Sequence, residues 1–173
     1  IMSYPEVVVD VETMGVDAGS APIAIGAVPF DREGEIYEAS THKVGIDFDD
    51  VLSHGCNIDG GTVGMWMEHG DLWLDLQEDA VSLRRALEEF NSWCEFYLQD
   101  EALFWSKGNE FDIGRILRPC YDIFDDLDFP WHRRRLRCLR TLELDEYTYP
   151  DTLHDPVSDG VAHAKDVIRY YND

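Results

Sequence analysis

The first 50 residues of the chain carry the hydrophobic pattern of β-strands. A short β-branched run at 6–10 and an apolar run at 23–30 predict two buried strands, and near alternation of apolar and polar residues at 35–48 predicts a third, more exposed strand. The sequence Asp-Arg-Glu-Gly at 31–34 predicts a hairpin turn between the second and third strands. We therefore expect these strands to form an antiparallel meander.

From residue 62 onward, apolar positions recur with the spacing of α-helices. Helices are predicted at 62–68, 82–98, 108–117 and 157–171, with a short strand at 102–105. Thr62, Ser82 and Asp155 are the expected caps of three of these helices, and Pro119 is expected to end another. Strands followed by alternating helix and strand predict an α/β domain, in which helices cover a mixed sheet. With 173 residues, of which 45% are hydrophobic, the chain fits one domain spanning 1–173.

The charge of the chain restricts how it can meet a nucleic acid. The net charge is −22, with three lysines against eleven arginines and 22 Asp against 14 Glu. An acidic surface with few lysines indicates adaptation to high salt, and the alternative is an ordinary acidic protein. In either case the charge argues against a broad basic surface for duplex DNA. Positive charge is concentrated only at 133–140, where five arginines lie.

Cysteine spacing and hydropathy exclude several other classes of protein. The cysteines at 56, 94, 120 and 138 lie far apart without a CxxC pair, so we expect no zinc knuckle, redox motif or disulfide. No run approaches 18 uncharged apolar residues, which predicts neither a membrane span nor a membrane partner. The chain opens directly into a strand without a basic leader, so a soluble protein of the cytoplasm is expected, or of the host cytoplasm if the chain is viral.

Two carboxylates at the end of the first predicted strand are the first candidate for chemistry. Asp10 and Glu12 are two residues apart, so the alternation of a strand directs both to the same face. Neighbouring carboxylates repel each other unless a cation lies between them, and oxygen ligands of this kind suit Mg²⁺ or Mn²⁺. Since the chain has 36 acidic residues, the alternative is a solvated strand end.

Two further segments add candidate groups. Asp112 lies in the first turn of the predicted helix at 108–117, where capping is the alternative explanation. His154 lies in a loop just before the last predicted helix, and Asp159 follows five residues later, so both side chains can reach one site.

Together these residues resemble the DEDDh exonucleases, the DnaQ-like branch of the ribonuclease H-like superfamily. The family has an Asp-x-Glu on its first strand, a middle Asp, and a His followed by an Asp at a distance of five residues. Flanking segments at 10–15, 21–27, 62–66 (Thr-x-x-x-Trp) and 137–141 (Arg-x-x-Arg-Thr) are similar to phage exonuclease A and the related bacterial 3′–5′ exoribonucleases. The resemblance implies a ribonuclease H-like mixed five-stranded sheet, an antiparallel meander plus parallel strands, flanked by helices.

The resemblance also implies roles for the residues that match. Asp10, Glu12, Asp112 and Asp159 would bind two Mg²⁺ or Mn²⁺ ions, with Asp10 between them, and His154 would be the general base that takes a proton from water. His163 and Asp166 on the last helix lack the spacing of the family motif, so we expect them to be structural. Gly160 stands where the relatives usually have a small residue such as Ala or Cys, and we expect this difference to have little effect on the site.

Residues around this centre are expected to bind the substrate: Thr13, Met14, Gly15, Trp66, Asn109, Arg137 and Arg140. Thr13, Met14 and Gly15 would line the pocket of the terminal nucleotide, while Met14 or Trp66 would stack on a base, with core packing as the alternative for both. The arginines would hold phosphates or pair with acidic residues of a second copy in a homodimer.

The expected activity is removal of nucleoside monophosphates from the 3′ end of single-stranded DNA. A 3′–5′ exoribonuclease acting on single-stranded RNA or 3′ overhangs is the first alternative, since recognition of the 2′-hydroxyl would decide between them. A catalytically silent nucleic-acid-binding module is the alternative of another class, and the five matching catalytic positions argue against it. A calcium-binding protein is disfavoured because no Asp-x-Asp-x-Asp-Gly loop is present.

Overall fold

A five-stranded mixed sheet organises the chain, which our computed structural model describes over residues 3–173. Its strands are β1 (Tyr4–Thr13), β2 (Pro22–Phe30), β3 (His42–Gly45), β4 (Leu98–Ser106) and β5 (Leu136–Cys138). Their spatial order is β3-β2-β1-β4-β5. Strand β2 is antiparallel to both β1 and β3, whereas β4 is parallel to both β1 and β5. The predicted meander joined to parallel strands is confirmed.

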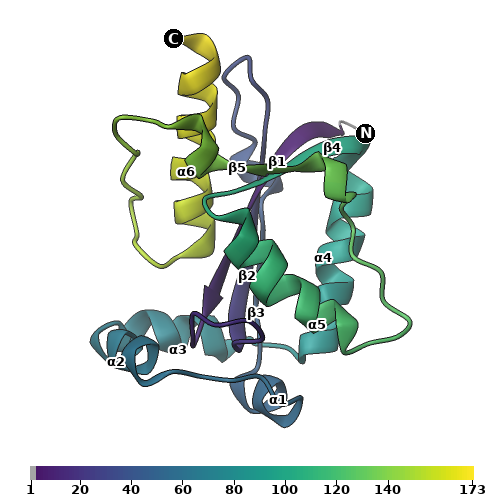
Figure 1. Cartoon of the computed structure of the whole chain (residues 1–173), viewed down its shortest axis with the longest axis vertical. Helices are drawn as coiled ribbons and strands as arrows, with labels where there is room; N and C mark the ends of the chain where they lie inside the picture. Colours follow the sequence, from purple (N-terminus) through teal and green to yellow (C-terminus); the bar gives the residue numbers. More distant parts are fainter. Residues whose placement is uncertain (1–2) are drawn as a thin grey trace.

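Helices and helical turns connect and cover these strands. The α-helices of the described residues are α1 (Phe48–Ser53), α2 (Gly60–Glu68), α3 (Gly70–Glu78), α4 (Leu83–Tyr97), α5 (Arg118–Asp122) and α6 (Pro156–Asn172). Segment η2 (Glu110–Leu117) is a π-helix, and η1 (Glu38–Ser40), η3 (Arg133–Arg135) and η4 (Leu139–Leu142) are short 3₁₀ turns. Figure 1 shows α6 and α4 on opposite sides of the sheet, with α1, α2 and α3 grouped at one end of the molecule. Across residues 3–173 no helix has the length and apolar character needed to cross a membrane.

The central strand β1 sends side chains to both faces of the sheet, and both faces are covered. Val7 and Val9 face the larger core, which includes the apolar stripe of α4, while Val8 belongs to a second core that includes α6; all three are fully buried. Because side chains alternate along a strand, Asp10 and Glu12 continue the Val8 face toward α6. The sheet thus carries two acidic side chains onto the face covered by α6, beside the apolar side chains of the second core.

Helix α6 lies unusually close to the sheet because two glycines leave room for it. A Cβ atom on Gly26 of β2 would lie 2.6 Å from the backbone of Pro156, at the start of α6. A Cβ atom on Gly160 of α6 would lie 2.7 Å from the Cγ2 atom of Val28. These contacts fix the first turns of α6 against β1 and β2, and Asp159 is carried on that part of the helix. The expectation that Gly160 matters little is therefore corrected, since the close approach depends on it.

Several predicted boundaries between residues 35 and 68 are wrong. The strand expected at 35–48 is reduced to β3, because η1 precedes it and α1 follows it, capped by Asp47. Helix α2 begins at Gly60, and its cap is Asp59, whose carboxylate accepts the backbone N–H of Thr62 at 2.8 Å. Thr62 is thus inside the helix, and helix α3 was not predicted.

The predicted stop at Pro119 is also wrong, because the helix changes its winding there. The π-helix η2 ends at Leu117 and α5 begins at Arg118, so Pro119 falls in the first turn of a new helix. A proline is tolerated in a first turn because its missing N–H needs no partner there. By contrast, the caps Ser82 of α4 and Asp155 of α6 are confirmed by the hydrogen bonds that their side chains accept.

Candidate active site

Three carboxylates meet where β1 ends beside the start of α6. Asp10 and Glu12 come from β1 and Asp159 from the first turns of α6, and one oxygen atom from each lies within 4.8 Å of the others. The strand places its two acids on the α6 face, and the close packing of α6 brings the third acid against them. Grouped oxygen atoms at this spacing are a fit for a divalent cation.

Asp112 approaches the group from the other side of β1. It lies on η2 with 6% of its surface exposed, outside the tight group of three. Its carboxylate accepts backbone N–H groups, including that of Val11 between the two acids of β1, and these bonds lower its pKa. Its charge in turn raises the pKa of Asp10 and Glu12, so it faces the same space. The structure therefore brings all four predicted carboxylates to one place.

Burial makes this cluster a poor place for four negative charges without a cation. Burial, and after it the neighbouring carboxylates, raises the pKa of Asp10 well above its ordinary value and that of Glu12 to about 8. Burial likewise raises the pKa of Asp112 to about 7 and that of Asp159 to about 6. Divalent cations would compensate these charges in the ionised state, so the buried oxygen-rich donor set fits Mg²⁺ or Mn²⁺.

His154 stands at the edge of the carboxylate cluster in a constrained loop. Its Nδ1 atom lies 4.0 Å from Oε2 of Glu12, and its backbone adopts a left-handed conformation with φ of 64°. The backbone N–H of His154 donates to Asp159 and lowers the pKa of that carboxyl, so this conformation also organises a metal ligand. Burial, and next the charge of His69, lowers the pKa of His154 below 6.5, which keeps the imidazole neutral at pH 7.

Aromatic residues of α2 and its end support His154. The ring of Trp66 lies 5.9 Å from the ring of His154, and that of His69 lies 5.0 Å from it. The indole N–H of Trp66 donates to the carbonyl of Thr13 at 2.9 Å, which ties helix α2 to the end of β1. With 3% of its surface exposed, Trp66 fills space behind the histidine, as the core-packing alternative for this residue describes.

The loop after β1 is held rigidly beside the carboxylates. Thr13 donates from its hydroxyl to the carbonyl of Gly15 at 2.7 Å, and the side chain of Asp59 accepts the N–H of Val16 at 3.0 Å. Thr13, Met14 and Gly15 are all buried, with 5% of Met14 exposed, so Met14 too packs inside the protein in this structure. Residues 13–15 therefore present mainly their backbone to a ligand, whereas the exposed side chains of this loop begin at Val16.

A cleft of about 650 Å³ has Asp112 in its wall. Of the predicted substrate-binding residues, Asn109 and Arg140 line it together with Asp112. Arg137 does not, because its guanidinium donates to the carbonyls of Arg134 and Leu136. Sequence reasoning missed Lys107, which also lines the cleft.

Lys107 lies close enough to the carboxylate cluster for its charge to act on two of the carboxylates. Its charge lowers the pKa of Asp10 and of Asp159, and its ammonium group lies 4.8 Å from the centre of the Tyr147 ring. The sequence offered one sign of this role. Lys107 is one of only three lysines, and it lies directly between strand β4 and the segment Gly108-Asn109 that leads to Asp112.

The second histidine and aspartate of α6 have different surroundings. Asp166 is fully buried and anchors the loop before α6, accepting the backbone N–H and the hydroxyl of Thr148 at 2.9 and 2.6 Å. The structural role expected for Asp166 agrees with these bonds. His163 instead faces the site, with its Nε2 atom 3.9 Å from Oδ1 of Asp10, and burial lowers its pKa to about 4.

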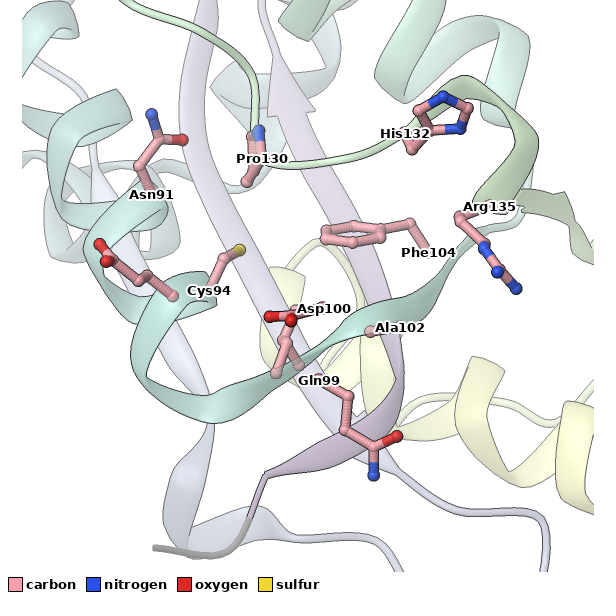
Figure 2. Close-up of a pocket in the computed structure, with 11 residues that line it drawn as sticks. Asn91, Cys94, Gln99, Asp100, Ala102, Phe104, Pro130, His132 and Arg135 are labelled. Carbon is pink, nitrogen blue, oxygen red and sulfur yellow. The ribbon is translucent and has the colours of Figure 1, made fainter.

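A separate cleft of about 370 Å³ lies away from this chemistry (Figure 2). Its lining includes Cys94 of α4, Gln99 and Asp100 near the start of β4, and Arg135 before β5. The carboxylates lie beside the opposite, carboxyl-terminal end of β4, so this cleft is not part of the site. Arg135 is also engaged in an ion pair with Glu101.

The order of the strands and the carboxylates from β1, η2 and α6 are those of the DnaQ-like exonucleases, which have a ribonuclease H-like fold. Among solved structures, the chain is similar to cell-death related nuclease 4 (CRN-4), with 12% identity, a TM-score of 0.61 and coverage of 99% of this chain and 65% of that one. It is also similar to Pop2p of S. pombe in a form with Mg²⁺ and Mn²⁺ bound, with 16% identity, a TM-score of 0.60 and coverage of 96% of this chain and 82% of that one. A full-length 3′-exonuclease shows 13% identity, a TM-score of 0.64 and coverage of 96% of this chain and 81% of that one. The chain thus spans slightly less than two thirds of the first of these proteins.

The family described as the 3′-5′ exoribonuclease Rv2179c-like domain matches residues 5–167, and the chain belongs to this family. No curated protein matches the chain by sequence. The predicted membership in the DnaQ-like exonucleases and the predicted ribonuclease H-like fold are therefore confirmed.

Proposed function

We propose that this protein is a metal-dependent 3′–5′ exonuclease of the DEDDh type, which releases nucleoside monophosphates from the 3′ end of single-stranded nucleic acid. The observation that carries the proposal is the meeting of Asp10, Glu12, Asp112 and Asp159 beside His154 at one end of the sheet. Three segments far apart in the chain contribute to this site: β1, η2, and α6 with the loop before it.

The four carboxylates would hold two divalent cations, Mg²⁺ or Mn²⁺. Bound cations of this kind neutralise phosphate charge and favour ionisation of water near neutral pH. Asp10 and Glu12 both lie within range of the charges of Asp112 and Asp159, and the resemblance to the DEDDh exonucleases would make Asp10 the ligand of both ions. The buried surroundings exclude competing water and strengthen the interaction of these carboxylates with a cation.

His154 would accept the proton of the attacking water. The imidazole is neutral at pH 7 because burial lowers its pKa, and the nitrogen that faces the carboxylates is free of any protein hydrogen bond among the described residues. Trp66 and His69 restrict the ring, while the bond from the His154 backbone to Asp159 couples the position of the base to that of a metal ligand. Such positioning of a general base contributes about 10²–10⁴-fold to a rate.

Single-stranded RNA is the substrate that we favour, because the matching family is described as an exoribonuclease. Single-stranded DNA is the second candidate, supported by the similarity of the segment from His154 to Asp159 to the phage form of that motif. A duplex is disfavoured for both sugars, because a net charge of −22 leaves no broad basic surface.

The test is turnover of matched RNA and DNA oligonucleotides, labelled at the 5′ end, with Mn²⁺ across a salt series. We expect a ladder of products shortened from the 3′ end, faster on RNA, and no ladder with EDTA or with His154→Asn. Intact substrate of both kinds at low and at molar salt would refute the exonuclease proposal. Faster turnover of DNA would keep the mechanism and reverse the preferred substrate.

A further inference from the structure

Unpaired positive charge gathers on one part of this acidic protein. Across residues 3–173, half of the fourteen basic side chains form an ion pair with a carboxylate. The seven without one are Lys107, Arg118, Arg133, Arg134, Arg137, Arg140 and Lys165. Six of these seven lie between residues 107 and 140. With 36 acidic residues available as partners, this concentration of unpaired cations calls for a ligand that is itself negative.

Two adjoining clefts run through this region. The first, of about 650 Å³, begins at Asp112 and contains Lys107 and Arg140. The second, of about 470 Å³, contains Arg118 and Arg133. Both are lined by Asn109 and Glu110 at the start of η2, so they meet there.

The meeting point is less negative than its sequence suggests. Glu110 is the one acidic residue that lines both clefts, and its carboxylate forms a 2.9 Å ion pair with Arg115 of the same segment. Asn109 beside it offers an uncharged amide. A phosphate chain can therefore pass from one cleft to the other without meeting an uncompensated carboxylate at the junction.

Aromatic side chains accompany the cations in the second cleft. Phe129 and Trp131 line it, and the guanidinium of Arg118 lies 5.6 Å from the centre of the Phe129 ring. The two rings stack on each other with centroids 5.0 Å apart. Trp131 is buried, so the half-buried Phe129 is the ring of this pair that a base can reach, while the cations beside it contact phosphates.

We propose that the two clefts form one track, made by Lys107, Arg140, Arg118 and Arg133, which binds the phosphates of the strand upstream of its 3′ end. The inference rests on the proposed function, since the carboxylates at one end of the track receive the terminal nucleotide. Lys107 and Arg140 then contact the part of the strand next to the reacting bond, and Arg118 and Arg133 contact nucleotides farther from it. The track supplies locally the positive charge that the rest of the surface lacks.

The test compares two double variants that change the charge equally. Arg118→Gln/Arg133→Gln removes the far end of the track, and Arg84→Gln/Arg85→Gln is the control on α4, where both arginines already pair with carboxylates. Turnover is measured on a 5′-labelled dodecanucleotide, which can reach the far end, and on a dinucleotide, which is too short to do so.

We expect the track variant to lose about tenfold in kcat/KM on the dodecanucleotide at moderate salt, with the dinucleotide unaffected. Its affinity for the dodecanucleotide should also depend less on salt. The slope of log Kd against log salt should fall by about 1.4, because each lost contact to a single strand removes about 0.7. The control variant should match the wild type in both measurements.

Three outcomes would overturn the track. The first is an unchanged rate and salt slope in the track variant, and the second is an equal loss in the control. The third is a pair of results: light scattering shows a dimer for the wild type and a monomer for the track variant, and the track variant degrades the dodecanucleotide at the normal rate. The cations would then contact acidic residues of a second copy and not the substrate. Failure of the wild type on both substrates would instead refute the proposed function, and the salt slope of binding would still test the track.

Discussion

Without divalent cations, the protein should lose stability as the pH rises from 4.5 to about 8, and Glu12→Gln should remove much of that loss. Burial, followed by the charges of Asp159 and Asp112, raises the pKa of Glu12 from 4.5 to about 8. An acid whose pKa is higher in the folded state binds more protons folded than unfolded. Folding is therefore favoured most below pH 4.5 and progressively less up to pH 8. Glutamine has nearly the same shape and does not ionise, so it escapes this cost.

The expected size of the effect at pH 7 follows from the interval between the unfolded pKa and that pH. The interval from 4.5 to 7 is about 2.5 pH units. At about 1.4 kcal/mol per pH unit, the metal-free variant should be more stable than the wild type by about 3.5 kcal/mol. A domain of this length changes its Tm by about 2–4 °C per kcal/mol, so the variant should unfold about 7–14 °C higher.

Thermal unfolding followed by circular dichroism in EDTA, between about pH 5 and pH 8, measures this difference. The control is Asp125→Asn, which changes the net charge equally at an exposed position and so reports general repulsion in a chain of net charge −22. With saturating Mn²⁺ the order should reverse, because the wild type gains the free energy of metal binding while the variant has lost a ligand.

The destabilising effect assigned to buried Glu12 is refuted if Glu12→Gln is no more stable than the wild type in EDTA near pH 7. An equal gain in Asp125→Asn would refute it as well, because overall charge would then account for the effect. An unchanged order with saturating Mn²⁺ would show that Glu12 does not bind the metal.

Other parts of the site lead to further predictions. His154→Asn should lower kcat by about 10²–10⁴-fold while calorimetric Mn²⁺ affinity stays within about twofold, because asparagine tolerates the left-handed backbone; a large loss of affinity would assign His154 to the metal. Wild-type kcat/KM should rise with pH with a midpoint below 6.5, since the neutral imidazole is the active form, and His154→Asn should lack this limb. Gly160→Ala should cost about 1–3 kcal/mol in urea unfolding by pressing on Val28, and Val28→Ala in the same chain should recover part of that loss; equal stability of Gly160→Ala and wild type would contradict the close packing of α6. Asp166→Asn should speed proteolysis of the loop around Thr148 and lower turnover more than Mn²⁺ affinity, and an unchanged cleavage rate would show that Asp166 does not anchor the loop.

The sheet and the acidic cluster could be predicted from the sequence because their signals are local or come in a fixed order. Three successive valines indicate a strand buried on both faces, and strand alternation is enough to place Asp10 beside Glu12. Asp112, His154 and Asp159 have weak signals individually, and the order and spacing of the family pattern carry their prediction. The cap Ser82 is likewise a local signal.

The features that the sequence did not reveal depend on contacts between distant segments. Pro119 was expected to end a helix, but a change from π to α winding, which has no simple sequence signal, accommodates it. For Trp66 the sequence left base stacking and core packing both open, and the burial of its ring together with the hydrogen bond to the Thr13 carbonyl favours core packing. Lys107 reaches the carboxylates because β4 lies parallel to β1, which is a property of the sheet and not of the residues around it.

The residues of this site differ in how much free energy is needed to displace them. Asp10 and Glu12 lie on the central strand β1, where they pair with Gly26 and Ala24 of β2, so moving them requires disruption of the sheet. His154 lies at the end of a loop that Asp166 ties down at Thr148. Local opening of that loop costs less free energy than global unfolding. The protein therefore has access to a state that retains its carboxylates but lacks its base, and the population of this state is set by the loop anchor rather than by the stability of the domain.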